Sequence, residues 1–310
     1  MNRGEKYIAR IIFKNKIYEN DGQKYEDFFV KVLKKSKPAF QAVKAHGNIG
    51  DRKNDGFDKT SGTYYQVFGP ENIEKQKTIS DAVNKLVEDF EGAYNNWNSI
   101  CKINKFYYVV NDKYKGCPAP IHEKLLELGS QYTDIDFEIL ASRDLEDIFI
   151  NLGEDDIIDV IDFIPSLNLD TLDYSVLKEA IEYILNSEAD NSIDGLYDIP
   201  DFNDKIQFNQ LNVQIERWLT TASYNLGDLN RYFKRNSKFV KKELRDKFSE
   251  FYLESKGKYD NGIDDYNNLR FIYILEKACF DNRKIVRDSV LILMACFFES
   301  CDIFENPKGV

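Results

Sequence analysis

The sequence predicts an α/β domain over residues 1–150 and an all-α domain over residues 151–310. Two observations lead to this prediction. Before residue 150, short runs of aromatic and β-branched residues alternate with stretches of helical period. After it, nearly every segment has helical period, and we find no internal repeat or low-complexity linker. A chain of 310 residues is also long enough for two ordinary domains.

The first part contains helices and strands in an order typical of a sheet covered by helices. The helices are predicted at 25–35, 78–97 and 118–128, and the strands at 39–45, 63–68, 103–110 and 135–140. Pro38 ends the first helix, and the glycine-rich segment 47–62 indicates a turn or hairpin. Since 103–110 is almost wholly apolar, we expect it to be a central strand. The order predicts right-handed crossovers.

The second part is predicted to be a helical domain. Its helices are expected at 155–164, 173–186, 204–221, 237–254, 263–279 and 282–300, with a loop at 187–200. Asp170 and Asp173 can cap the second of these helices. The last segment, 285–304, is so apolar that we expect it to be buried in this chain or against another subunit.

Charge is unevenly distributed along the chain. The net charge is −11, yet residues 1–60 carry +6, while 144–204 hold 18 acidic residues and one base. A basic part of an acidic protein indicates a local anionic partner, with a solvated surface as the alternative. A second basic region at 231–258 has ten basic and four acidic residues with interleaved aromatics. There we favour a partner contact or a solvated face over DNA.

Composition argues against several classes of protein. Five cysteines without a CxxC pair and only two histidines make a zinc site improbable. No apolar run reaches the length of a transmembrane helix. The first residues contain no apolar signal core, so we expect a cytoplasmic protein.

The candidate chemistry lies in a glycine-rich turn and the strand that follows it. The turn carries Asp51, Asp55 and Asp58, and the strand 63–68 has Gln66 in its middle. Glu26, on the first predicted helix, supplies a third side-chain oxygen. Carboxylate and amide oxygens bind Mg²⁺, which assists phosphodiester cleavage. The pattern therefore predicts that Glu26, Asp55 and Gln66 hold Mg²⁺ or Mn²⁺ at one edge of the sheet.

Each of these residues also has a structural interpretation. Asp51 and Asp55 could cap turns, because Asn-Asp-Gly is a strong turn signal. Gln66 could satisfy backbone groups at a sheet edge, and Glu26 could face solvent. His46 is better explained as a structural residue at a strand end than as a general base.

The order of helix acid Glu26, turn Asp55 and the Gln66-x-Phe68 strand resembles the restriction-endonuclease-like fold, in particular its Mrr-like branch. Residues 47–57 (GNIGDRKNDGF) and 65–71 (YQVFGPE) are similar to a bacterial family that reads GDxxNDG and then FQVYxPE. That family supplies effector subunits of three-component ABC-ATPase (Lamassu-like) antiphage defence systems. The resemblance is specific over about 24–95 and architectural elsewhere.

The resemblance implies a Mg²⁺-dependent DNA endonuclease, in which Asp55 and Gln66 bind metal and Glu26 completes the site. It also implies DNA, an SMC/ABC-type ATPase and a further small subunit as partners, without a membrane, and a helical C-terminal domain for assembly. That domain could also pair two copies of the chain. Phe68 stands where the Mrr-like pattern has lysine, so Lys53 in the turn, or Lys75 or Lys77 on the next helix, would have to replace it.

Two alternatives remain open. The same fold with a degenerate site could bind nucleic acid or the ATPase partner without cutting, an interpretation that Phe68 favours. The chain could also be a structural subunit whose helical half mediates assembly. A lysine beside Asp55 and Gln66 would separate the first hypothesis from these two.

Overall fold

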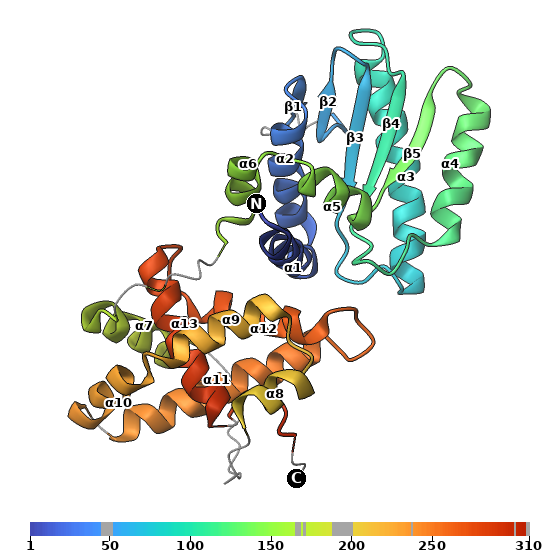
Figure 1. Cartoon of the computed structure of the whole chain (residues 1–310). Coiled ribbons are helices and arrows are strands. Elements are labelled where there is room, and N and C mark those ends of the chain that lie inside the picture. Colours follow the sequence, from blue (N-terminus) through green and yellow to red (C-terminus); the bar gives the residue numbers. More distant parts are fainter. Residues whose placement is uncertain are drawn as a thin grey trace. The chain divides into compact units, whose positions relative to one another are not determined.

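The computed structural model describes residues 1–44, 52–164, 169, 172–187, 201–236, 238–300 and 302–307 (Figure 1). The chain forms two compact units. The N-terminal unit is Lys16–Ile161, and the C-terminal unit combines Met1–Asn15 with Asp162–Val310. Helix α1 (Arg3–Glu19) contributes residues to both. Because compact units need not coincide with domains, the domain boundary at residue 150 stays a prediction.

The N-terminal unit is built on a five-stranded mixed sheet in the order β1-β2-β3-β4-β5. The strands are β1 (Phe40–Ala42), β2 (Gly56–Asp58), β3 (Thr63–Phe68), β4 (Lys105–Val110) and β5 (Asp136–Leu140). β1, β2 and β3 pair antiparallel, whereas β3, β4 and β5 pair parallel. The four predicted strands are therefore present, and the predicted hairpin at 47–62 contributes the short β2.

Helices cover both faces of this sheet (Figure 1). They are α2 (Gly22–Ser36), α3 (Gln76–Trp97), α4 (Ala119–Gln131) and α5 (Ser142–Ile150), while α6 (Glu154–Ile161) packs against α2. On one face, alternate strand residues such as Tyr64, Phe106 and Tyr108 join α3 and α4 in an apolar core. On the other face, Phe29 of α2 packs against Tyr65 at a ring distance of 5.7 Å. The prediction of an α/β domain is thus confirmed.

The C-terminal unit is helical, as predicted. Its helices after residue 162 are α7 (Tyr174–Asn186), α8 (Phe202–Phe208), α9 (Val213–Ser223), α10 (Leu226–Arg235), α11 (Lys238–Lys258), α12 (Tyr266–Ala278) and α13 (Lys284–Glu299). The apolar α13 packs against α7 and α9, and the segment from Val290 to Phe298 is buried throughout. Asp173 caps α7 by accepting hydrogen bonds from Ser175 N and Val176 N, whereas Asp170 lies outside the described residues.

Three helices in the described part of the chain were not predicted from the sequence: α1, α5 and α10. The predicted helix 204–221 is also two helices. It breaks after α8 because Gln210 adopts a left-handed φ of 51°, and Asn212 then caps α9 through Gln214 N. No helix in the described part of the chain is both long and apolar enough to cross a bilayer.

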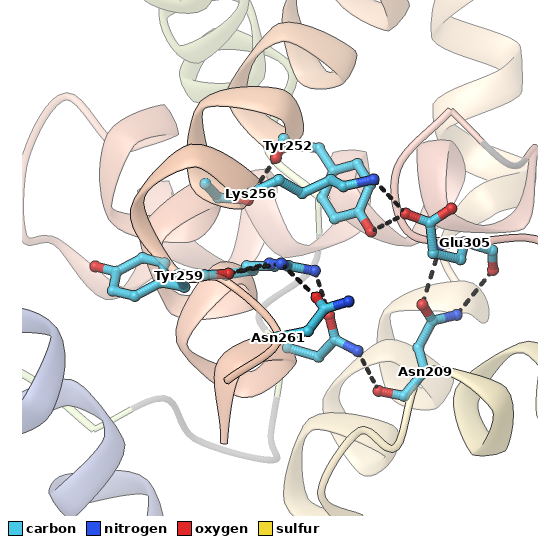
Figure 2. A network of polar contacts seen from close by, with 9 residues as sticks. Asn209, Tyr252, Lys256, Tyr259, Asn261 and Glu305 are labelled. Atoms are coloured by element: carbon cyan, nitrogen blue, oxygen red, sulfur yellow. Dashed lines mark hydrogen bonds and ion pairs between the residues drawn. The ribbon is translucent and has the colours of Figure 1, made fainter. Parts of the chain in front are cut away.

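A polar network anchors the end of the chain to the helices of the C-terminal unit (Figure 2). Asn209 donates to Glu305 O at 2.8 Å and accepts from Glu305 N at 3.0 Å. The Glu305 carboxylate also accepts hydrogen bonds from Tyr252 Oη at 3.0 Å and Lys256 Nζ at 2.7 Å. Buried Arg270 donates to the carbonyl of Tyr259 nearby. These contacts satisfy polar groups that lack a regular secondary-structure partner.

A candidate active-site cavity

Strand register brings Asp55 and Gln66 together. Gly56 of β2 lies opposite Tyr65 of β3, so the next step of the same register sets Asp55 against Gln66. Cross-strand neighbours place their Cβ atoms about 4.5–5.5 Å apart on one face of the sheet. Asp55 Oδ2 also accepts a hydrogen bond of 2.7 Å from Val67 N. The two side chains are buried, with exposed fractions of 4% and 3%.

A cavity of about 280 Å³ lies at this point, where β3 ends. It is lined by Gly22, Glu26, Asp55, Gln66, Val67, Phe68, Gly69 and Lys85. The three residues that the sequence assigned to metal binding, Glu26, Asp55 and Gln66, therefore line one space, although they come from a helix, a turn and a strand. Glu26 is half-buried and is not a solvent-facing acid.

The oxygen set of this cavity suits a hard divalent cation. Gln66 Oε1 is buried and has no hydrogen-bond partner among the described residues, so it has an unused lone pair beside two carboxylates. No cluster of three or more His, Cys, Asp or Glu side chains within the described ranges could hold a metal. Mg²⁺ needs no such cage, since it is usually held by one or two carboxylates, waters and substrate phosphates.

Lys85 brings an ammonium group to the same cavity. It lies on α3, and its Nζ is 2.5 Å from Asp89 Oδ2, one helical turn further on. Asp89 is fully buried, and its other oxygen, Oδ1, lies 3.0 Å from Lys53 Nζ. One buried carboxylate therefore holds two lysines from different segments, because a buried charge is stable only when it is paired.

The lysines that the sequence proposed do not line the cavity. Lys53 extends over α3, where it contacts Glu88 Oε1 at 2.7 Å as well as Asp89. Hydrogen bonds to Glu88 and then Asp89 raise the pKa of Lys53 and keep it charged. Lys75 is exposed at the N-cap of α3, and Lys77 is exposed two residues later. The lysine beside Asp55 is Lys85.

Phe68 occupies the place where the resembling family has lysine. It lines the cavity, and its ring stacks on Tyr108 with centroids 6.1 Å apart. Tyr108 donates a hydrogen bond of 3.1 Å to Ala82 O. Burial raises the pKa of Tyr108, and the charges of Asp89, Cys117 and Asp55 add to this effect. Tyr108 therefore stays neutral behind Phe68, whose apolar ring lines the cavity.

The turn before β3 has mainly structural roles for its other residues. Asp58 accepts hydrogen bonds from Thr60 N at 2.8 Å and Ser61 N at 3.4 Å, so it caps a turn. Gly56 does not open space for a substrate, because a side chain there would collide with the Phe40 ring, so the protein itself fills that space. His46, Asp51 and the two glycines at 47 and 50 lie outside the described residues.

A larger cavity of about 580 Å³ lies elsewhere in the N-terminal unit, at the ends of α2 and α5. None of the candidate residues lines it. Two lysines line it, Lys35 and Lys37, and Lys35 is paired with Asp156 at 2.9 Å and Asp159 at 2.6 Å. We therefore place the candidate chemistry in the smaller cavity.

The second basic region forms α10 and α11. Its aromatic residues Phe233, Phe248 and Phe251 are buried in the core. Arg231, Lys234, Arg235 and Lys242 are exposed, together with Phe239, whose exposed fraction is 74%. These basic side chains therefore face solvent in the C-terminal unit.

Sequence reasoning missed Lys85 and Asp89. The signal was present, because Asp89 interrupts the helical stripe of Ala82, Leu86 and Phe90, where a charge is out of place. A buried acid predicts a cationic partner, and Lys85 stands four residues before it, at the spacing of a helical ion pair.

Comparison with known proteins gives one finding. Residues 176–305 match the family model of C-terminal domain 10 of the ABC-three component (ABC-3C) systems. This range covers α7 to α13 and the segment that ends with Glu305. The search of curated proteins and the search of solved structures each found no match. The helical part of the chain is thus similar to the C-terminal domain of a component of such systems.

Proposed function

We propose that this chain is a nuclease-like effector subunit of an ABC-three component antiphage defence system, and that its N-terminal unit cleaves DNA phosphodiesters with Mg²⁺ or Mn²⁺. The observation that carries the proposal is the convergence of Glu26, Asp55, Gln66 and Lys85 on one cavity. Two carboxylates, an unpartnered amide oxygen and an ammonium group supply both a cation site and a positive charge for a phosphate.

The proposed roles follow from the contacts. Asp55 Oδ2 accepts a hydrogen bond from Val67 N, which fixes the carboxylate at the cavity that Gln66 also lines, and Glu26 completes the oxygen set. A divalent cation at these oxygens would activate water and offset charge on the phosphorane. Lys85, held by Asp89, would contact a non-bridging phosphate oxygen, where a fixed positive charge stabilises the transition state.

The fold and the assembly role are part of the same proposal. A helix followed by antiparallel strands, a crossover helix and parallel strands agrees with a restriction-endonuclease-like domain. The match over residues 176–305 supports a C-terminal unit that binds the other subunits, which we propose to be an SMC/ABC-type ATPase and a small protein. Fold-level likeness alone does not carry an activity, so the cavity carries that part.

Cleavage of supercoiled plasmid tests the activity. The full chain is incubated with Mg²⁺ or Mn²⁺, alone and with its partner subunits, and compared with Asp55→Ala. We expect metal-dependent nicking that Asp55→Ala abolishes. Asp58→Ala is the matched control, because Asp58 caps a turn three residues away without lining the cavity. Equal nicking by wild type and Asp55→Ala would refute this site.

The second candidate function is a degenerate nuclease fold that binds nucleic acid or the ATPase partner without cutting. Phe68 favours it, because an aromatic ring lines the cavity where the family pattern has lysine. Absence of nicking under every condition, with DNA or partner binding intact, would support this alternative and leave Lys85 as a binding residue.

A further inference from the structure

We infer that the outward face of α2 and its C-terminal end bind the phosphate backbone of duplex DNA, the substrate proposed for the cavity to which the same helix contributes Glu26. The inference deepens the proposed function and rests on it. We define the lysine stripe as Lys24, Lys31, Lys34 and Lys37.

Helical geometry places the stripe on one face. Lys24, Lys31 and Lys34 are separated by seven and three residues, so they share one side of α2, and Lys37 is the C-cap residue. The opposite side of the helix is buried through Tyr25, Phe28, Phe29, Val32 and Leu33. The stripe therefore faces away from the core.

The lysines of the stripe are largely available to a ligand. Lys24, Lys34 and Lys37 are exposed, and none of these three has an ion-pair partner among the residues that the structure describes. In contrast, Lys35 on the same helix is engaged by Asp156 and Asp159. Exposed lysines without acidic partners attract polyanions most strongly, because their field is not cancelled locally.

The rest of the N-terminal unit has the opposite charge, which limits where DNA can approach. Residues 22–44 contain six lysines and two acidic residues. Residues 118–161 contain two basic and twelve acidic residues. Those acids include exposed side chains of α4, β5 and α6, namely Glu123, Glu127, Asp136, Glu138, Glu154 and Asp155. A phosphate backbone is therefore attracted to α2 and repelled by the α4 and β5 surface.

The dimensions of the stripe suit duplex DNA. Thirteen residues separate Lys24 from Lys37, a length of about 20 Å along the helix, over which one DNA strand presents about six phosphates. Glu26, two residues after Lys24, lines the cavity. Residues two apart on a helix point about 200° apart, so Glu26 faces another side of α2 than Lys24, and exposed Asp27 lies among the lysines of the stripe. Duplex DNA on the stripe would therefore contact the helix that contributes Glu26 to the cavity.

Salt-dependent DNA binding tests the inference separately from cleavage. The full chain carrying Asp55→Ala is titrated in EDTA onto a short fluorescent duplex at KCl concentrations from about 50 to about 200 mM. The test variant adds Lys24→Gln, Lys34→Gln and Lys37→Gln. The matched control adds Lys102→Gln, Lys115→Gln and Lys124→Gln, which lie outside α2 and are paired with acids.

We expect the test variant to bind more weakly, with the slope of log K against log salt reduced by about 1 per lysine, and the control to bind like its parent. Unchanged binding and slope in the test variant, or an equal loss in the control, would overturn the inference. So would a loss seen only with Lys234→Gln, Arg235→Gln and Lys242→Gln in the C-terminal unit. Retained DNA binding with lost binding of a partner subunit would make the stripe a protein-docking surface instead. Because no metal is present, absence of cleavage does not affect these outcomes.

Discussion

Lys85 Nζ lies 2.5 Å from Asp89 Oδ2, and this ion pair fixes a positive charge beside the cavity that Asp55 lines. Asp89 is fully buried and Lys85 is partly exposed, so the carboxylate is the immobile partner. A lysine side chain that an ion pair already orders loses less conformational entropy on binding a phosphate than a lysine side chain in solvent does. The geometry thus provides an ammonium group that β3 itself lacks.

Replacement of Lys85 should separate catalysis from binding. We expect Lys85→Met to lower the nicking rate by about 10²-fold, since removal of one fixed group that stabilises transition-state charge typically has that effect. Lys77→Met is the control, because Lys77 is exposed on α3 without lining the cavity. Circular dichroism confirms folding. A variant that is folded and nicks at the wild-type rate would exclude Lys85 from the reaction.

Gln66→Leu should stabilise the protein and inactivate it. Gln66 Oε1 is buried without a hydrogen-bond partner among the described residues, and an apolar side chain of similar size removes that cost. We expect the free energy of unfolding in denaturant to rise by about 1 kcal/mol while metal-dependent nicking is lost. Gln41→Leu, at an exposed position of β1, should change stability by less than about 0.5 kcal/mol. A destabilised Gln66→Leu protein would mean that the amide has a structural role.

Two helical glycines should respond oppositely to alanine. A Cβ at Gly92 of α3 would lie 2.6 Å from Lys53 Cγ, so Gly92→Ala displaces the side chain that reaches Asp89. We expect unfolding free energy to fall by about 1 kcal/mol through overpacking. A Cβ at Gly129 of α4 would lie 3.8 Å from Phe137 Cδ2, an ordinary contact, so Gly129→Ala should gain about 0.5–1 kcal/mol from helix propensity. Thermal unfolding of both variants measures these two changes in stability. A Gly92→Ala protein that is more stable than wild type would contradict the prediction.

The carboxylate of Glu305 should make the stability of the C-terminal unit dependent on pH. Burial raises the pKa of Glu305, but the contacts with Lys256 and Tyr252 outweigh it and lower the pKa below its usual 4.5. A depressed folded-state pKa contributes stability that is present above pH 4.5 and is lost as pH falls through the folded-state value. Because the side chain is half-exposed, we expect less than about 1 kcal/mol.

Denaturant unfolding of wild type and Glu305→Gln across this acid range measures the effect. Glu305→Gln should be less stable than wild type at neutral pH and should lose less stability on acidification. Tyr252→Phe, which removes one of the two donors, should lie between them. Parallel pH profiles for all three proteins would show that the carboxylate does not contribute.

Local sequence patterns were sufficient to predict most of the helices and strands. Alternation and apolar runs predicted β3 and β4 closely, and the charge asymmetry predicted a basic N-terminal part. Glu26, Asp55 and Gln66 were selected as candidates by residue type and order alone. That they line one cavity depended on strand register, which sets Asp55 against Gln66 and which short-range patterns do not encode.

By itself, then, the sequence determined the two classes of architecture, most of the strands and helices, and the oxygen-bearing residues of the candidate site. Only the tertiary structure decided which lysine stands beside them. Lys53 was one of three lysines proposed from the sequence, yet in the structure its ammonium group pairs with the buried carboxylate of Asp89 on α3, and the same carboxylate holds Lys85, which lines the cavity. The physical reason is that a buried charge selects its partners by proximity in space, which depends on how α3 packs against the sheet.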